Sequence, residues 1–362
     1  IVIPTLLSST AGIAEQVERL EVHFLASPPG ALHFALLSDW MDAASERNAA
    51  DDTLLAAARA GIAALNERHG PVEGGARFLL LHRRRLWNEG EGRWMGWERK
   101  RGKLHELNRL LRGASDTTFI AIDGSAARVP ADVRFVITLD SDTRLPRDTV
   151  RRLIGKMAHP LNAPRLDRQA GRVVEGYAIL QPRVTPSLPV GNEGSFFQRV
   201  FSSLSGIDPY ALTVSDVYQD LFGEGSYTGK GIYDIDAFEA ALAGRVPEST
   251  LLSHDLFEGA FARSGLASDV EVVEEFPPRY DVGAQRHHRW ARGDWQLLPW
   301  ILGHGPRREA GQGEAGNREA SHREASHREA GHREASHREP VPAIGWWKML
   351  DNLRRSLTPP AT

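Results

Sequence analysis

Two carboxylates stand one residue apart, at Asp140 and Asp142, directly after an apolar run. The run Val133–Leu139 holds five apolar residues, which is typical of a strand buried on both faces. In open α/β sheets, ligands bind at the carboxyl ends of such strands. Two acidic groups this close need a cation or a phosphate-bound metal to balance them, so we predict a metal–diphosphate site. A surface turn is the alternative, because Asp and Ser are ordinary turn residues.

Holding a diphosphate with a divalent cation is the task of a nucleotide-sugar transferase. Carboxylate and phosphate oxygens suit Mg²⁺ or Mn²⁺, and one or two carboxylates commonly suffice. Asp140 and Asp142 supply them. The cation would neutralise the charge that develops on the leaving nucleoside diphosphate.

Transfer with inversion at the sugar also needs a general base that takes a proton from the acceptor hydroxyl. Asp255, in Ser253-His254-Asp255, is the candidate. This residue is expected to begin a helix, where Asp is also an ordinary N-cap. Both roles therefore remain open for it.

Two further places offer groups for a donor or an acceptor. Asp39 ends an apolar run and could accept hydrogen bonds from a base or a ribose, or simply cap a turn. The stretch Arg286–Gln296 is rich in Arg and Trp, which suit anion clamping and stacking on a sugar. Its first residue Arg286 and the pair Arg289-Trp290 are the expected contacts, although an exposed salt-bridged face would look similar.

Two other phosphate motifs fit poorly. A phosphatase-type aspartyl nucleophile wants Thr or Val two residues after the second Asp, where this chain has Arg144. The Gly-rich stretch Gly223–Gly231 contains Gly229-Lys230, but Gly231 stands where a phosphate loop requires Ser or Thr. We therefore do not interpret that stretch as an ATP site.

Strands alternating with helices must position these residues, which predicts βαβ units and a mostly parallel sheet. The expected strands lie at 1–7, 33–38, 77–81, 119–122, 133–139, 177–184 and 269–275. The expected helices lie at 11–25, 48–69, 103–111, 145–159, 193–204, 255–264, 285–302 and 346–357. The Trp- and Gly-rich stretch Trp87–Trp97 is expected to be a loop.

Composition limits the class of protein. The net charge of -3 gives no electrostatic case for nucleic acid as a partner. There is no Cys, hence no disulfide and no thiolate metal site. No apolar run approaches the ~20 residues that span a bilayer. The chain begins inside a strand-like run without a Met, so we expect it to be a fragment of a longer protein.

The C-terminal part changes character. From Arg308 to Glu339 a five-residue REASH-like unit repeats without any large apolar residue, which predicts a disordered low-complexity insertion. Its His residues could alternatively bind metal. Trp346–Leu357 then has an apolar face beside basic residues, which favours a membrane-interface helix or a helix that packs back on the domain. We therefore divide the chain into a catalytic domain at 1–304, an insertion at 305–340 and an amphipathic helix at 341–362.

The order of these motifs resembles that of processive family 2-like glycosyltransferases, the cellulose synthase type. It is more similar still to the glycosyltransferase domain of cyclic β-1,2-glucan synthases. The resemblance covers nearly the whole chain outside the repeat. It rests on the stretches GKLHELNRLLRG, FVITLDSDTRLP, YQDLFGEGSYTGKGIYDIDAF, LLSHDLFEGAFARSG, HHRWARGDWQLLPW and WKMLDNLRRSL.

The resemblance implies a glycosyltransferase A-type, Rossmann-like α/β fold with a mostly parallel sheet flanked by helices. It implies UDP-glucose as donor, Mg²⁺ or Mn²⁺ at Asp140 and Asp142, a β-1,2-glucan as acceptor, and inversion at the sugar. By position, Asp39 would contact the uridine, Lys103 the nucleotide, and Asp255 would be the base. Arg289 and Trp290 would lie by the diphosphate and the acceptor. Full-length members lie in the bacterial inner membrane with this domain on the cytoplasmic side.

The chain departs from the cellulose synthases at two motifs. Ser253-His254-Asp255 replaces Thr-Glu-Asp, and Arg286 stands at the first position of Gln-x-x-Arg-Trp. The alternatives that remain are another family 2-like polysaccharide synthase, a sugar-nucleotide nucleotidyltransferase on a similar sheet, and a non-catalytic module that binds a glycan or nucleotide.

Overall fold

The first third of the chain forms parallel strands joined by helices. The structure, a computed structural model, describes residues 1–122, 124, 127–187, 194–202, 217–246, 251, 254–304 and 341–357, with side chains of the last helix to Arg354. The order of elements is β1 (Val2–Leu7), α1 (Thr10–Leu25), β2 (Phe34–Trp40), α2 (Asp51–His69) and β3 (Phe78–Arg83). All seven residues of β2 are buried, as its unbroken apolar run predicts.

The middle of the chain contributes the strand that ends at the paired carboxylates. It contains β4 (Leu86–Asn88), β5 (Arg93–Met95), α3 (Arg99–Leu111), β6 (Phe135–Thr138), β7 (Thr143–Arg144), α4 (Thr149–Met157), a short 3₁₀ turn at Pro160–Asn162, β8 (Arg165–Asp167), β9 (Arg172–Glu175) and β10 (Ile179–Ser187). Helix α4 begins at Thr149, four residues later than expected, and Pro146 lies outside it.

The last third supplies most helices around the site. It contains α5 (Phe196–Phe201), α6 (Val217–Phe222), β11 (Gly231–Asp234), α7 (Ile235–Leu242), α8 (Asp255–Ala262), β12 (Ser264–Glu275), α9 (Tyr280–Gln296), α10 (Leu298–Ile301) and α11 (Ala343–Leu357). In α5, Ser195 and Gln198 form a reciprocal capping box, which fixes where this short helix begins.

One eight-stranded sheet runs through the molecule in the order β3-β2-β1-β6-β11-β10-β12-β7. The pairs β3–β2, β2–β1, β1–β6 and β10–β12 are parallel, whereas β11 is antiparallel to both of its neighbours. The chain moves from β1 outward to β2 and β3, and then returns to β6 on the other side of β1. This reversal is a topological switch point, and in such sheets it opens a crevice at the carboxyl ends of the strands.

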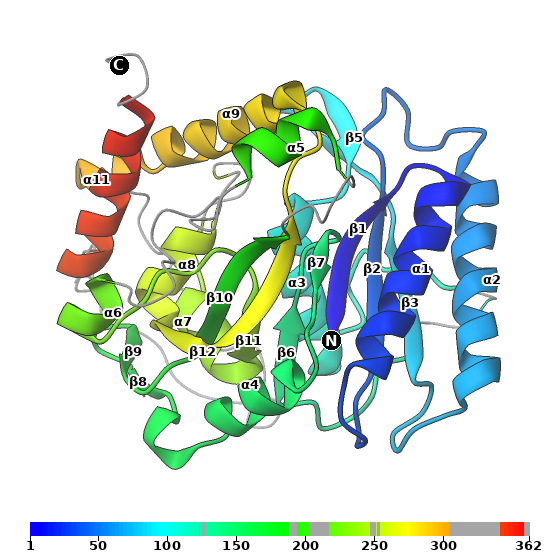
Figure 1. The fold of residues 1–362 in the computed structure, drawn as a ribbon, viewed down its shortest axis with the longest axis horizontal. Helices are drawn as coiled ribbons and strands as arrows, with labels where there is room; N and C mark the ends of the chain where they lie inside the picture. Colours follow the sequence, from blue (N-terminus) through cyan, green and yellow to red (C-terminus); the bar gives the residue numbers. More distant parts are fainter. Residues whose placement is uncertain are drawn as a thin grey trace, which may run out of the picture.

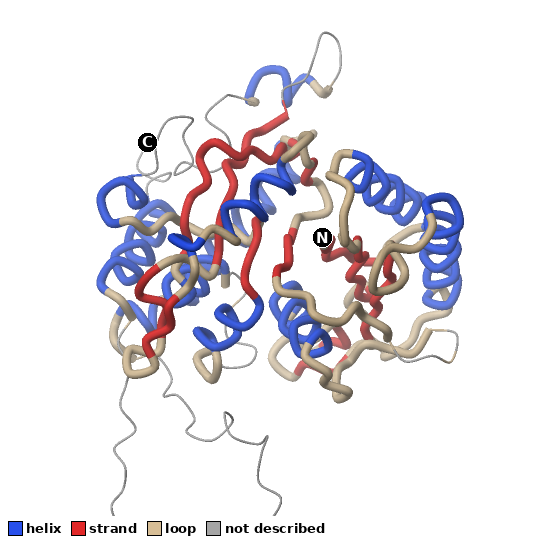
Figure 2. The backbone as a smooth tube through the Cα atoms, turned by 90° about the horizontal axis from the view of Figure 1, so that it is seen from below, coloured by secondary structure: helices blue, strands red, loops and turns tan. Residues whose placement is uncertain are grey.

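Helices cover both faces of this sheet (Figures 1 and 2). Alternating residues of each strand enter different cores: Leu36 of β2 packs with Leu20 and Ile62, from α1 and α2, whereas Leu37 enters the core that includes Leu107 of α3. The latter core also takes in α7, α8 and α11, and a further cluster packs α4 against β6, β10 and β12. The predicted α/β class, with a mostly parallel sheet flanked by helices, is confirmed.

Several local expectations differ from the structure. The stretch Trp87–Trp97 contains the hairpin β4–β5, because Trp87 pairs with Trp94 across it. The expected strand at Phe119–Ile122 is reduced to isolated bridge residues, Phe119, which pairs with Arg83, and Ile122. The hairpin β8–β9 was not expected. The pentapeptide repeat lies outside the described residues, as do the outer parts of the expected helix at 193–204.

Helix α11 packs back on the domain. Met349 and Leu353 are buried, and Gly345 lies against Ala260 of α8. The Trp346 indole donates to the Ile301 carbonyl at 2.7 Å, while Trp347 remains 51% exposed. A role of this helix at a membrane interface, and the three-part division of the chain, stay predictions. None of the helices in the described ranges combines the length and the hydropathy that a bilayer crossing requires.

Candidate active site

A cavity of about 470 Å³ opens at the carboxyl ends of the central strands. Residues from distant parts of the chain line it, among them Lys100, Asp140, Asp142, Lys230, Asp255, Glu274, Arg286, Arg289 and Trp290. The cavity lies beside the switch point between β1 and β6, where the fold predicts ligand binding. The sequence-predicted metal, base and clamping residues therefore meet at one place.

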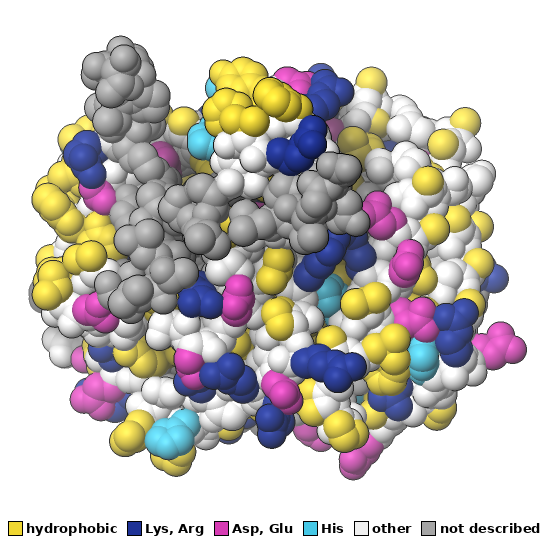
Figure 3. Space-filling view, viewed as in Figure 1, with side chains coloured by type: hydrophobic (Ala, Val, Ile, Leu, Met, Phe, Trp, Pro, Cys, Tyr) yellow, Lys and Arg dark blue, Asp and Glu magenta, His cyan; other side chains and the backbone are white. Residues whose placement is uncertain are grey.

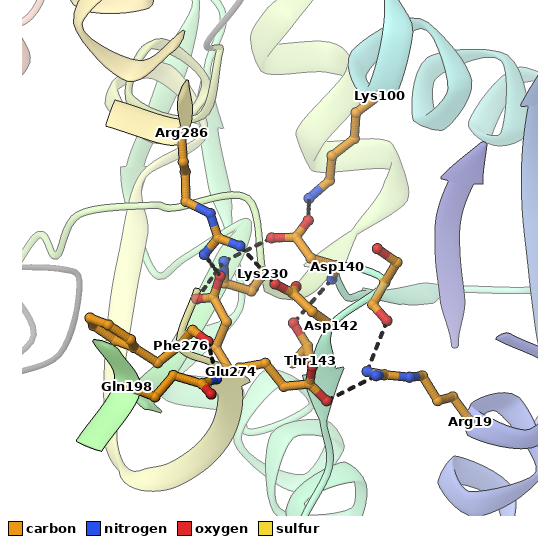
Figure 4. A network of polar contacts seen from close by, with 12 residues as sticks. Arg19, Lys100, Asp140, Asp142, Thr143, Gln198, Lys230, Glu274, Phe276 and Arg286 are labelled. Atoms are coloured by element: carbon orange, nitrogen blue, oxygen red, sulfur yellow. Dashed lines mark hydrogen bonds and ion pairs between the residues drawn. The ribbon is translucent and has the colours of Figure 1, made fainter. Parts of the chain in front are cut away.

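Two lysines hold the first carboxylate of the Asp-Ser-Asp motif (Figure 4). Lys100 of α3 lies 2.5 Å from Oδ1 of Asp140, and Lys230 lies 2.8 Å from its Oδ2. Burial alone would raise the pKa of Asp140, but the two ammonium groups outweigh it and hold that pKa well below its usual value. Burial lowers the pKa of Lys230, but the neighbouring carboxylates of Asp140 and Glu274 raise it by more. The pKa of Lys230 is therefore raised above its usual value. The two ammonium groups thus favour the ionised form of Asp140.

A third carboxylate completes the cluster. Glu274, at the end of β12, is 3.3 Å from Lys230 and 3.0 Å from Arg286 of α9. The same guanidinium reaches Oδ2 of Asp142 at 3.0 Å. Burial raises the pKa of Glu274, and Asp142 and Asp140 add to this while Lys230 opposes it. Three carboxylates and three cations therefore face one another in a charge-balanced network (Figure 4).

The carboxylates also fit a divalent cation. One ligand oxygen each from Asp140, Asp142 and Glu274 lie within 4.8 Å of one another. An all-oxygen set of this kind suits Mg²⁺ or Mn²⁺ rather than a softer metal. The ammonium of Lys230 already bridges two of these groups, so a positive charge stands among them in this structure.

Asp255 is the first residue of α8 and faces the same cavity. The N-cap position belongs to His254, which makes no side-chain capping bond, so the capping role considered for Asp255 is wrong. Burial raises the pKa of the Asp255 carboxyl; Lys100 opposes this and Asp140 adds to it. A carboxylate with a raised pKa is a better proton acceptor than an ordinary surface Asp.

The Gly-rich loop from Gly223 to Lys230 connects the two acidic groups. A Cβ on Gly229 would stand 2.7 Å from Oδ1 of Asp255, and the backbone there has a φ of +81°. The Gly229 carbonyl accepts from Lys100 at 2.7 Å. Only glycine allows this approach of the backbone to the carboxylate. The loop is therefore shaped to the site, although it is not a phosphate loop.

The basic and aromatic residues of α9 reach the cavity as predicted. Arg286, Arg289 and Trp290 all line it, and Trp290 stacks against His287 with ring centroids 5.3 Å apart. Asp294, one turn further along α9, also lines the cavity. Helix α9 thus provides one wall, with the anion-pairing Arg286 near the carboxylates.

Asp39 and Lys103 lie elsewhere. Both are buried, and neither belongs to the cavity lining. Asp39 accepts from Arg83 at 2.8 and 2.9 Å and pairs with Lys103 at 3.1 Å, while Lys103 also donates to the Thr5 carbonyl. Their predicted contacts with a nucleotide stay predictions.

Sequence reasoning missed three residues of the site. Glu274 ends a predicted strand, and the rule that ligands bind at carboxyl ends could have found it. Lys230 lies in the stretch that was dismissed because it is not a phosphate loop. Lys100 lies in the basic run before the predicted helix, where nothing distinguishes it from Arg99 and Arg101.

The fold and the site define an α/β protein with an acidic, cation-lined pocket at the switch point of its sheet. The resemblance inferred from the sequence is confirmed by comparison with known proteins. Over 361 residues, 100% of this chain, it is 52% identical to the cyclic beta-(1,2)-glucan synthase NdvB of Rhizobium meliloti (strain 1021). The chain spans 11% of the length of that relative. No family model matches the chain.

Two solved structures are similar to this chain at a low level. A structure of S. aureus TarS 1-349 has a TM-score of 0.38 at 12% identity, covering 82% of this chain and 64% of that one. A second S. aureus TarS structure has a TM-score of 0.36 at 11% identity, covering 82% of this chain and 39% of that one. Scores this low support no conclusion about the site.

Proposed function

We propose that this chain is a metal-dependent, inverting glucosyltransferase that uses UDP-glucose to extend a β-1,2-glucan. One observation carries the proposal: Asp140, Asp142 and Asp255 line a single cavity at the sheet's switch point. The identity to a cyclic glucan synthase supports the choice of glucan, since that relative is named for this product. A cation and a base are the two things that such a transfer needs.

The carboxylate cluster handles the leaving group in this proposal. Asp140 and Asp142 would hold Mg²⁺ or Mn²⁺, with Glu274 as a third oxygen donor. When bound, the cation neutralises charge on the leaving diphosphate. Lys100, Lys230 and Arg286, now paired with the carboxylates, are then available to donate to phosphate oxygens.

Asp255 handles the nucleophile. Its carboxylate accepts the proton of the acceptor 2-hydroxyl as that oxygen bonds to the anomeric carbon. The bond from the same carbon to the UDP oxygen breaks on the opposite face, so the configuration inverts. Burial, which raises the pKa of Asp255, makes it a competent base.

Helix α9 would bind the remaining parts of the substrates. The Arg289 guanidinium suits the diphosphate, and the Trp290 ring suits the apolar face of a sugar. Asp39 and Lys103 would contact the uridine and the nucleotide once the bound donor draws them from their ion pairs.

The test is release of UDP from UDP-glucose in the presence of Mn²⁺, with the linkage of the product determined. Asp255→Asn should lower transfer by at least about 10²-fold while UDP still binds. Asp140→Asn should instead abolish Mn²⁺-dependent UDP binding. Asp116→Asn, a change at an exposed Asp paired with Arg109, is the matched control.

Four results would point elsewhere. Release of pyrophosphate would favour a nucleotidyltransferase. UDP binding without any transfer would favour a non-catalytic module. Near-normal turnover by Asp255→Asn would remove the assigned base. A β-linkage other than 1,2 would favour another polysaccharide synthase.

The proposal includes a membrane as the place of action, on the cytoplasmic side of a bacterial inner membrane. Exposed hydrophobic side chains gather over α5 and the start of α9 (Figure 3). They include Phe196, Phe201 and Tyr280, each at least 60% exposed. Aromatic residues of this kind suit the boundary between lipid and water. Sedimentation of the chain with anionic vesicles, lost on Phe196→Ser with Phe201→Ser, is the expected result; sedimentation that this double variant retains would contradict it.

A further inference from the structure

Lys348 of α11 is a buried ammonium group at the wall of the cavity. Its Nζ donates to the Gly225 carbonyl at 2.7 Å and to the Glu224 carbonyl at 3.0 Å. It also lies 5.2 Å from the ring centroid of Tyr218 in α6. A lysine that is only 5% exposed is thus held by the first part of the Gly-rich loop.

Helix α11 packs tightly against the domain, which fixes the position of Lys348. Met349 is fully buried, and a Cβ on Gly345 would stand 2.7 Å from the Cβ of Ala260. The Tyr218 hydroxyl donates to Asp351 at 3.1 Å, which ties α6 to the same helix. Lys348 therefore projects from a support that is packed against α8, the helix that Asp255 begins.

The loop that Lys348 holds ends in the catalytic cluster. The Gly225 amide donates to the Ser264 carbonyl at 2.8 Å, and the Thr228 amide donates to Oε1 of Gln181 at 3.0 Å. Gly229 then lies against Asp255, and Lys230 pairs with Asp140 and Glu274. Only four residues separate Gly225 from Lys230, so a shift at one end reaches the other.

We propose that Lys348 is a positioning residue: it fixes the loop that places Gly229 against Asp255 and Lys230 against Asp140. This inference rests on the proposed function of those two aspartates. It makes α11, which follows the pentapeptide repeat in the chain, a working part of the active site. Because its ammonium donates to the carbonyls of Glu224 and Gly225, a change at Lys348 acts on the reaction through the loop.

The physical reason is that Lys348 gives the loop a buried, charged donor. Removal of the ammonium leaves the Glu224 and Gly225 carbonyls without their charged donor, and hydrogen bonds to charged groups are among the stronger ones. A misplacement of about 1 Å in a catalytic group can cost roughly 10²-fold in rate. The loop carries Lys230 and contacts Asp255.

The experiment compares Lys348→Met, Lys348→Arg and the control Lys156→Met in the full 362-residue chain. Met keeps the unbranched side chain up to the ε position but cannot donate, whereas Arg can donate to both carbonyls. The Lys156 ammonium forms an exposed ion pair with Asp269 at 3.0 Å, so its variant tests the same chemical change away from the site. Hydrogen exchange and steady-state transfer from UDP-glucose are measured for each variant.

For Lys348→Met we expect faster amide exchange at Gly225 and Thr228, with α2 unchanged. We also expect kcat to fall about 10- to 100-fold, more than KM for UDP-glucose rises. Lys348→Arg should restore much of the slow amide exchange and much of kcat, and Lys156→Met should match the wild type in both measurements. A stability role alone would not give this split between kcat and KM, nor the rescue by Arg.

Unchanged exchange at Gly225 and Thr228 overturns the inference, whatever the activity does. Faster exchange with kcat within about twofold of the wild type overturns the positioning role. A wild-type chain that transfers no glucose is a failure of the proposed function, recognised before any variant is compared. In that case UDP affinity in Mn²⁺ replaces kcat as the readout, and an unchanged affinity in Lys348→Met counts against the inference.

Discussion

Arg83 and Asp39 form a bidentate ion pair in the interior, with Nε–Oδ1 at 2.8 Å and Nη2–Oδ2 at 2.9 Å. The other arm of the guanidinium donates to Glu106 at 2.8 Å. Burial opposes ionisation of Asp39, but Lys103 and Arg83 outweigh it, so the pKa of Asp39 lies below its usual value. Arg83 therefore pairs with two buried carboxylates at once, Asp39 of β2 and Glu106 of α3.

Arg83→Met should destabilise the fold by about 3–5 kcal/mol, because Asp39 and Glu106 would lose a shared buried partner. Chemical denaturation measures the change in the free energy of unfolding. Arg68→Met is the control, since Arg68 pairs with Glu21 on the surface and should cost at most about 1 kcal/mol. Equal losses in the two variants would show that the buried ion pair contributes no more to the free energy of unfolding than the exposed one.

Lys230→Met should change the affinities of the site for Mn²⁺ and for UDP in opposite directions. The ammonium competes with a metal ion for Asp140 and Glu274, so its removal should strengthen Mn²⁺ binding in the absence of nucleotide by about tenfold. UDP binding should weaken, because a donor to the phosphates is lost. Calorimetric titrations with Mn²⁺ alone and with UDP check both directions. Lys156→Met should change neither, and a loss of Mn²⁺ affinity in Lys230→Met would contradict the competition.

Much of the fold could be predicted from apolar runs and their period. The buried strand β2 and the helix α2 lie within two or three residues of the expected bounds, because an unbroken apolar run and an Ala-rich amphipathic pattern leave few alternatives. The hairpin β4–β5 was missed because its pairing depends on Trp87 meeting Trp94, and its Gly content indicated a loop.

The site was predictable where chemistry and strand ends coincide. Asp140, Asp142 and Asp255 lie in the expected cavity, because carboxyl ends of parallel strands and the helix beside them share one sheet edge. Lys100 could not be predicted, since its meeting with Asp140 depends on how α3 lies across the sheet. Asp39 also lies near the end of a strand, but it forms an ion pair with Arg83 of the neighbouring strand β3 and does not line the cavity.

Glu258, one turn after Asp255 in α8, should make stability depend on pH. Burial, and then the neighbouring Asp255, raise the pKa of Glu258 to about 8. The folded state therefore keeps a proton that the unfolded state releases near pH 4.5, the ordinary value for Glu. The stability it contributes is complete below that pH and is lost as the pH rises toward 8, by at most about 1.4 kcal/mol per pH unit.

Denaturation of the wild type and of Glu258→Gln at a series of pH values measures this effect. The Gln variant, which cannot ionise, should show a flatter decline between about pH 4.5 and 8. Glu67→Gln, an exposed change in α2, should keep the wild-type slope. A wild-type slope in Glu258→Gln would mean that the carboxyl is ionised in the folded protein.

Gly229→Ala should impair the site for two reasons that can be separated. The backbone has a φ of +81°, which costs Ala roughly 1–2 kcal/mol, and the new Cβ would stand 2.7 Å from the Asp255 carboxylate. Gly113→Ala is the control, because Gly113 has a φ of +87° with nothing within 4 Å of its Cβ position.

Both variants should lose similar stability from the backbone, but only Gly229→Ala should push Asp255 aside and lower transfer. In an Asp255→Ala background, Gly229→Ala should cost no more unfolding free energy than Gly113→Ala. An excess cost that persists there would mean that the clash is with another group.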